Sequence, residues 1–255
     1  KKNIEINNCN IILFINFNIL IFFMTKINTK LTKLIKYYSL INYNLIYENN
    51  AINRYKNNRS NISGNKANLL KKLEKSIKNV KNCDLKKNAE DIVFADGHPD
   101  SKIMIVAEGP GADEDREGLP FLGRAGQLLD KMLMSINLNR NNVYITNVVN
   151  YRPPENRKPT SNEIKIYLPY LIKHIEIINP KILILMGSTA LNAIIGDKEP
   201  ISFMRGKWIE KKVGNCKTFV LVTFHPAFLM RQPAQKRMTW IDLKMIKERK
   251  SKLKI

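Results

Sequence analysis

The chain has 255 residues, of which 44% are hydrophobic and 25% charged, and its formal net charge is +21 at pH 7. This length allows one α/β core with a short appendage. The three cysteines are too few for a disulfide framework, so we expect a reducing, cytoplasmic compartment. The excess of 43 Lys and Arg over 22 Asp and Glu predicts attraction to a polyanion, first of all nucleic acid, although Lys, Asn and Ile are abundant throughout the chain.

The N-terminal quarter of the chain differs in composition from the rest. Residues 6–25 carry no charge and include the apolar run ILFINFNILIFF, but asparagines interrupt this stretch and no A-x-A cleavage site follows it. Because the first methionine is Met24, we interpret residues 1–23 as an upstream extension of the working protein, with a membrane anchor as the alternative. Residues 24–65 predict a short helix and a flexible linker, which leaves residues 66–255 as the functional domain.

From residue 66 onward, helical and strand patterns alternate. Apolar residues at helical spacing, with capping signals, predict helices at 69–80, 127–136, 161–178, 188–195 and 235–252. Short apolar runs predict buried strands at 103–107, 143–149, 181–187 and 218–224. This alternation predicts an α/β fold of three αβα layers around a four-stranded parallel sheet.

A long loop follows the first predicted strand, with the sequence EGPGADEDREGLPFLGRAG at residues 108–126. Ligands bind beyond the carboxyl ends of the strands in an open parallel sheet, where Glu108, Asn147 and His225 are expected to meet. An amide such as Asn147 matches an imide edge, and Phe121 offers a face on which a flat ring can stack. The alternatives are core packing for Phe121 and His225, backbone satisfaction for Asn147, and a solvated face for the four acids of the loop.

Three blocks of the sequence resemble the signatures of a known family. AEGPGADEDREGLPFLGRAGQLLDKML, VYITNVVNYRPPENRKP and FHPAFLMRQPAQKR are similar in order and spacing to those of the type-4 uracil-DNA glycosylases, over about residues 69–253. The resemblance implies a uracil-DNA glycosylase-like fold and a DNA repair hydrolase that flips uracil out of DNA, cleaves its N-glycosidic bond and leaves an abasic site. It also implies uracil-containing DNA as partner, no membrane association and a monomer.

The same resemblance assigns roles to the residues of the first block. Glu108, Gly109 and Gly111 would form the turn beside the sugar and the base, and Glu114 would assist the attacking water. Gly109 stands where the best-known uracil glycosylases carry a catalytic aspartate. Water activation is therefore left to Glu108, to Glu114 or to the backbone, and the sequence does not decide among them.

The resemblance assigns the remaining contacts as well. Phe121 would stack on uracil, Asn147 would read its N3/O4 edge, and His225 would donate a hydrogen bond to O2. Met230 and Arg231 would lie in a loop that enters the minor groove of the DNA.

One family feature is broken in this chain. The family carries a [4Fe–4S] cluster on four cysteines, and only Cys83 stands at a matching position, with Val80, Tyr151 and Tyr167 at the other three. Because a cubane cluster needs about four thiolates, we expect no cluster and no other cofactor. The two tyrosines are expected to hold the loop by aromatic packing instead.

Three other functions compete with glycosylase activity. One is a catalytically weakened paralogue that binds uracil or DNA after losing its cluster, although retention of Glu108, Asn147 and His225 argues against it. A cross-linking relative of the family would need a histidine in an inserted basic loop, and YRPPENRKP contains neither. A flavodoxin-like or nucleotide-binding domain would share the sheet, but the four acids after Gly111 would repel phosphate.

Overall fold

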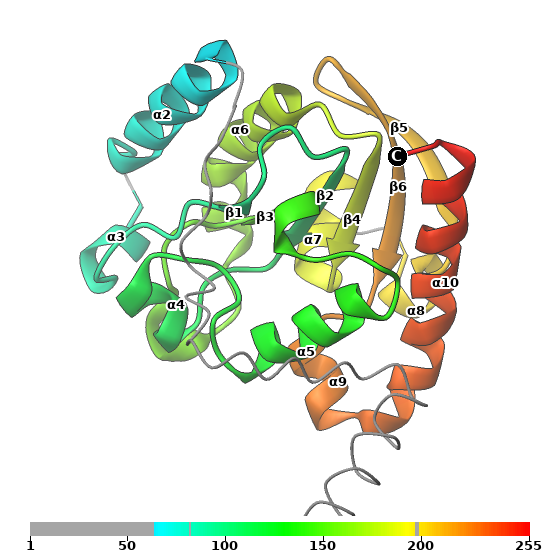
Figure 1. Ribbon diagram of the computed structural model, residues 1–255. Coiled ribbons are helices and arrows are strands. Elements are labelled where there is room, and N and C mark those ends of the chain that lie inside the picture. The colour runs from blue at the N-terminus through cyan, green and yellow to red at the C-terminus, as the bar shows by residue number, and fades with distance from the viewer. Residues whose placement is uncertain (1–63, 82, 197–198) are drawn as a thin grey trace, which may run out of the picture. The chain divides into compact units, whose positions relative to one another are not determined.

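The computed structural model describes residues 64–81, 83–196 and 199–255 (Figure 1). All of them belong to the second of two compact units of the chain, Lys56–Ile255. The expectations for residues 1–63, including the upstream extension and most of the linker, lie outside the described residues.

The described residues form a six-stranded mixed sheet with the order β1-β3-β2-β4-β6-β5. Its centre is the predicted set of parallel strands: β3 (Tyr144–Asn147), β2 (Ile103–Ala107), β4 (Ile182–Met186) and β6 (Cys216–Thr223). The α/β class is confirmed, but the count of four strands is wrong, because an antiparallel strand lies at each edge: β1 (Asp96–Gly97) and β5 (Trp208–Val213). β1 is too short to leave a pattern. β5 reads WIEKKV and buries only its last residue, so it lacks the apolar run of a central strand.

Helices cover both faces of the sheet, as the predicted three layers require (Figure 1). The longer ones are α2 (Gly64–Lys78), α5 (Arg124–Met134), α6 (Ser161–Ile178), α7 (Ser188–Ile194) and α10 (Lys236–Lys252). Alternate residues of β2 point to opposite faces. Met104 joins the core beneath α2, α6 and α7, whereas Ile105 joins the core beneath α5 and α10. Two hydrophobic cores therefore hold the sheet in place from both sides.

Short helices complete the connections between these elements. They are α3 (Leu85–Asn88), α4 (Ala112–Glu117), α8 (Ile201–Met204), α9 (Pro226–Arg231), η1 (Arg140–Asn142), η2 (Pro154–Asn156) and η3 (Pro233–Gln235). The acidic run in the first loop is thus the helix α4. Negative side chains are favourable in a first helical turn, and one of them, Asp115, is buried and accepts a hydrogen bond from the Glu90 N–H (3.1 Å).

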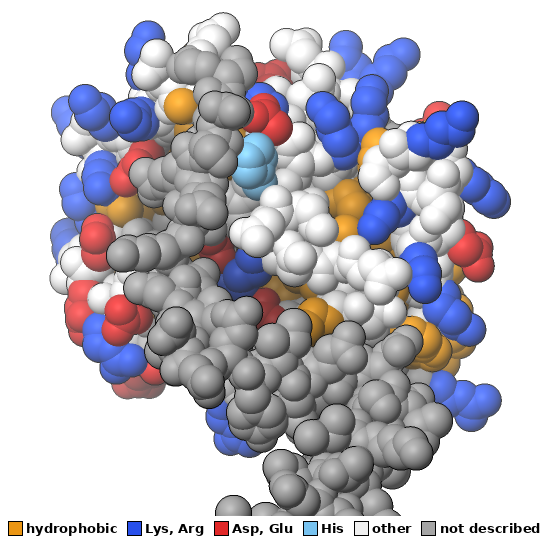
Figure 2. Space-filling model, viewed as in Figure 1, with side chains coloured by type: hydrophobic (Ala, Val, Ile, Leu, Met, Phe, Trp, Pro, Cys, Tyr) orange, Lys and Arg blue, Asp and Glu red, His pale blue; other side chains and the backbone are white. Residues whose placement is uncertain are grey.

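Basic side chains dominate the surface charge. Figure 2 shows Lys and Arg over α2 at one side of the viewed face and over α10 at the other. In the described part of the chain, no helix combines the length and the apolar character that a membrane crossing requires.

Candidate active site

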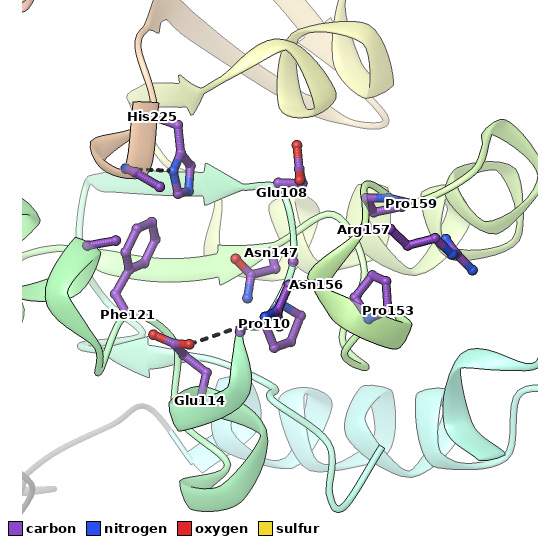
Figure 3. Close-up of a pocket in the computed structure, with 14 residues that line it drawn as sticks. Glu108, Pro110, Glu114, Phe121, Asn147, Pro153, Asn156, Arg157, Pro159 and His225 are labelled. Carbon is purple, nitrogen blue, oxygen red and sulfur yellow. Dashed lines mark hydrogen bonds between the residues drawn. The ribbon is translucent and has the colours of Figure 1, made fainter. Parts of the chain in front are cut away.

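A pocket lies at the edge of the sheet where the parallel strands end (Figure 3). Its volume is about 180 Å³. Its lining comes from the segment between β2 and the first turn of α5, the end of β3, the segment between β3 and α6, and the start of α9. The lining residues are Glu108, Gly109, Pro110, Gly111, Glu114, Phe121, Ala125, Asn147, Pro153, Asn156, Arg157, Pro159, His225 and Ala227. The residues expected at the strand ends therefore share one pocket.

Phe121, Asn147 and His225 come together in this pocket from three distant segments. The rings of Phe121 and His225 are stacked, with centroids 5.4 Å apart and an interplanar angle of 23°. Asn147 is the last residue of β3 and is 4% exposed, and Figure 3 shows its amide end pointing toward Phe121. No hydrogen bond joins that amide to another described residue, so its donor and acceptor remain available to a ligand.

His225 presents a neutral imidazole with a defined tautomer. Its Nδ1 accepts a hydrogen bond from the Ala227 N–H at 3.1 Å, as the N-cap of α9. The ring proton must then sit on Nε2, which is left as a donor. Burial, helped by the positive charge of Arg231, lowers the pKa of His225 to about 4. The side chain is therefore an uncharged donor at neutral pH.

Glu114 holds its own loop together through three hydrogen bonds. Its Oε1 accepts hydrogen bonds from the Leu122 N–H (2.8 Å) and the Gly123 N–H (3.0 Å), and its Oε2 accepts one from the Gly111 N–H (3.0 Å). A Cβ on Gly111 would lie 2.7 Å from Glu114 Oε2, so this close approach requires glycine. The carboxylate thus ties the start of the loop to its end.

Glu108 has a different environment from Glu114. It follows β2 directly, and one of its oxygens, Oε2, accepts a hydrogen bond from the hydroxyl of Thr189 on α7. The neighbouring Gly109 allows tight packing of this turn, because a Cβ there would lie 2.8 Å from Val149 Cγ2. Among the described residues, no second partner occupies the other Glu108 oxygen. This carboxylate therefore has more free hydrogen-bonding capacity than that of Glu114.

The backbone of Phe121 is held in a left-handed conformation with φ of 59°. Arg140 Nη2 donates a hydrogen bond to the Phe121 carbonyl at 2.5 Å, and the same guanidinium pairs with Asp96 (2.7 Å) and Asp130 (2.8 Å). A Cβ on Gly126 would lie 1.8 Å from that carbonyl oxygen, so helix α5 can approach it only because position 126 is glycine. These contacts set the position of the Phe121 ring.

A buried polar network anchors the end of β6 just before His225. Asp242 of α10 accepts hydrogen bonds from the Thr223 hydroxyl (2.7 Å) and from Arg205 Nε (3.1 Å). Burial is the main reason that the pKa of Asp242 is raised. The network joins α10 to the strand that carries His225.

Two residues of this site were not found by sequence reasoning, namely Thr189 and Arg140. Thr189 contacts a residue 81 positions away, and Arg140 contacts one 19 positions away. The only available signal for Thr189 was its place just after a predicted strand, at the sheet edge where ligands bind. The roles of the proline-loop residues Asn156 and Arg157, which line the pocket, were also not anticipated.

The predicted DNA contacts lie beside the pocket. Met230 and Arg231 end helix α9, whose N-cap is His225, and neither of them lines the pocket. Arg231 is exposed, and the neighbouring Phe228 packs on Phe224 with ring centroids 4.9 Å apart. Their contact with the minor groove stays a prediction.

The four positions that match the family's cluster ligands lie together in a hydrophobic core. Cys83 (9% exposed), Tyr151 (4%) and Tyr167 (1%) are buried there, and the partly buried Val80 packs against the same core. One thiol among a valine and two phenols does not offer the four thiolates that a cubane cluster requires. Across residues 64–81, 83–196 and 199–255, no group of three or more His, Cys, Asp or Glu side chains could hold a metal ion. These residues do not fit an iron–sulfur cluster.

The fold and the pocket define an αβα protein that can hold a flat heterocycle between an aromatic face, an amide and a neutral imidazole. Comparison with known proteins identifies its family. The model of the uracil DNA glycosylase superfamily matches residues 94–244, and the chain belongs to this superfamily.

A type-4 uracil-DNA glycosylase of Pyrobaculum aerophilum is 39% identical over 180 residues, which cover 69% of this chain and 92% of that protein. One of Thermotoga maritima is 41% identical over 164 residues, covering 64% and 84%. One of Archaeoglobus fulgidus is 38% identical over 178 residues, covering 68% and 89%. The resemblance seen in the three sequence blocks is confirmed.

Proposed function

We propose that this chain is a uracil-DNA glycosylase, which hydrolyses the N-glycosidic bond of uracil in DNA and leaves an abasic site. The observation that carries the proposal is the meeting of Phe121, Asn147 and His225 in one base-sized pocket. Membership of the superfamily and similarity to several type-4 enzymes support it. The uracil nucleotide must leave the duplex to reach this pocket, and a damaged pair costs less to open.

The pocket side chains can recognise uracil by its shape and its hydrogen-bonding edge. Phe121 provides the stacking face, a contact worth about 1–3 kcal/mol per base. The Asn147 amide can accept from N3–H and donate to O4, a pair that the amino group of cytosine would not match. The Nε2–H of His225 can donate to O2.

The same histidine can lower the barrier to bond cleavage. As the bond between C1′ and N1 breaks, its electron pair moves onto uracil and negative charge develops at O2. A fixed neutral donor at that atom contributes about 3–4 kcal/mol, as comparable oxyanion donors do. His225 is suited to this task because its Nδ1 is already held by the Ala227 N–H.

Of the two candidate carboxylates, we assign water activation to Glu108 and loop bracing to Glu114. Glu114 already accepts three backbone N–H groups, whereas Glu108 accepts one side-chain hydroxyl. In the proposed step, the water oxygen bonds to C1′, Glu108 takes a water proton, and uracil leaves as an anion. A carboxylate beside the sugar also favours the developing oxocarbenium ion.

Several finer properties belong to the same proposal. Met230 and Arg231 contact DNA beside the flipped nucleotide, and the protein acts as a monomer. It works without an iron–sulfur cluster, because the buried tyrosines Tyr151 and Tyr167 occupy two of the ligand positions. Iron and sulfide analysis of the purified chain tests this: stoichiometric iron with the brown colour of a cluster would contradict it. The cytoplasmic location stays a prediction.

The direct test is excision from an oligonucleotide that contains one uracil, followed by alkaline cleavage and a gel, with a thymine oligonucleotide as control. Asn147→Ala and His225→Ala should each lower the single-turnover rate by about 10²–10³-fold. The matched controls Asn141→Ala and His98→Ala, which alter residues outside the pocket, should not. If the wild-type chain bound the uracil oligonucleotide without cleaving it, the paralogue that only binds DNA would be the better description.

A further inference from the structure

Glu108 is held by a residue that reaches it from another strand connection. Thr189 lies in the first turn of α7, which begins directly after β4. Strand β4 pairs in parallel with β2, and Val106 of β2 is in register with Leu185 of β4. The start of α7 is therefore next to the turn that carries Glu108, and the two side chains form a hydrogen bond.

The direction of this hydrogen bond follows from the chemistry of the two groups. An ionised carboxylate can only accept, so the Thr189 hydroxyl donates to Glu108 Oε2. Thr189 is 6% exposed and lies in a helix, and its branched Cβ restricts the rotation of its side chain. The donor is thus fixed in place, and one oxygen of the carboxylate is fixed with it.

No cation in the described part of the chain competes for this carboxylate. Arg157 lines the same pocket, but its guanidinium makes two hydrogen bonds to Glu163, at 2.7 and 2.8 Å. That pairing is also the main reason that the pKa of Glu163 is lowered. The hydroxyl of Thr189 is therefore the group that determines where Glu108 points.

We propose that Thr189 is a positioning residue for hydrolysis: its hydroxyl orients the Glu108 carboxylate so that the second oxygen faces the attacking water. This inference rests on the proposed function and on the assignment of water activation to Glu108. Thr189 itself touches neither uracil nor water. Its contribution is to the rate of the chemical step and not to the affinity for DNA.

The test uses the full chain and compares Thr189→Val with Thr189→Ser. Valine keeps the shape of threonine but has no donor, whereas serine keeps the hydroxyl. Single-turnover excision is measured against enzyme concentration, which separates the maximal rate from the concentration that gives half of it. Because a hydrogen bond to a charged group is removed, the maximal rate of Thr189→Val should fall by about 10- to 100-fold. The half-saturating concentration should change by less than about threefold, and serine should restore most of the rate.

A double-mutant cycle with Glu108→Gln shows whether Thr189 acts through Glu108. If it does, Thr189→Val should slow the Glu108→Gln enzyme by less than about twofold, because the group to be oriented is already changed. Equal slowing in both backgrounds would overturn the inference, as would a Thr189→Val enzyme as fast as wild type or a Thr189→Ser enzyme as slow as Thr189→Val. Should Thr189→Val lose its cooperative melting transition, Thr189→Ala enters the same cycle.

The outcomes also separate this inference from the function on which it rests. If the wild-type chain excised no uracil, this result would contradict both the proposed function and the inference about Thr189. If the Glu108→Gln enzyme were fully active, the assignment of water activation to Glu108 and the role of Thr189 would both be wrong, but the glycosylase activity would stand. Loss of rate in Glu108→Gln with an unchanged Thr189→Val enzyme would contradict the role of Thr189 alone.

Discussion

Replacing Glu114 with glutamine separates a structural carboxylate from a catalytic one. The wild-type side chain accepts three backbone N–H groups, two on Oε1 and one on Oε2. Glutamine has one acceptor oxygen and an NH2 group in place of the other. If its oxygen keeps the Leu122 and Gly123 N–H groups, its NH2 faces the N–H of Gly111, and two donors oppose each other.

The size of the effect follows from these contacts. One hydrogen bond to a charged acceptor is lost, worth about 1.5–3 kcal/mol, and the other two become neutral. We expect Glu114→Gln to lower the free energy of unfolding by about 2–3 kcal/mol. Urea unfolding followed by circular dichroism measures this change as a lower midpoint with little change in slope.

The matched control is Glu117→Gln on the same short helix. The Glu117 side chain is 58% exposed and pairs with the exposed Arg116, so its replacement should change stability by less than about 0.5 kcal/mol. Excision by Glu114→Gln should also be slower, because the loop that carries Phe121 is less well held. If Glu114→Gln unfolded at the wild-type urea concentration while excision was lost, the bracing role would be refuted, and Glu114 would belong to the chemistry.

Three further results are expected. Arg140→Met removes two ion pairs and the hydrogen-bond donor to the Phe121 carbonyl, so the free energy of unfolding measured in urea should fall by about 3 kcal/mol. Arg116→Met, which changes an exposed arginine, should not show this loss. Burial lowers the pKa of His174 to about 3, whereas the pKa of histidine in the unfolded chain is about 6.5. The folded protein therefore favours the neutral imidazole, and this contribution to the free energy of unfolding is complete above about pH 6.5 and is lost as the pH falls below that value. The decline in the free energy of unfolding toward about pH 4 should be shallower in His174→Gln. Affinity for DNA should fall steeply between about 50 and 200 mM salt, and a flat response would contradict phosphate contacts.

The central strands could be predicted because they are buried on both faces. All five residues of β2, IMIVA, are apolar and buried, so the strand appears in the sequence as a short continuous apolar run. The edge strands could not be found in the same way. β1 has two residues, and β5, with the sequence WIEKKV, has three consecutive charged residues and buries only its last side chain. Its pairing with β6 depends on the turn between them, where Gly214 has φ of 56°.

The part of the candidate site that lies at the ends of the parallel strands could be predicted from the sequence. Glu108, Asn147 and His225 each stand at the end of a parallel strand, and parallel strands end at one edge. The difference between Glu108 and Glu114 could not be predicted, because both are carboxylates in one acidic loop. Only the contacts show that Glu114 accepts three backbone N–H groups, whereas Glu108 accepts one side-chain hydroxyl.

By itself, the amino-acid sequence determined which segments form the central strands and which polar residues follow them, since the hydrophobicity of a segment is a local property of the chain. It also determined that four thiolates are not present at the cluster positions. Tertiary structure alone decided that β4 lies beside β2, and so that the Thr189 hydroxyl reaches Glu108. It likewise decided that Arg140 donates a hydrogen bond to the Phe121 carbonyl. Such hydrogen bonds depend on ångström-scale distances between distant segments, and these distances exist only after the helices have packed on both faces of the sheet.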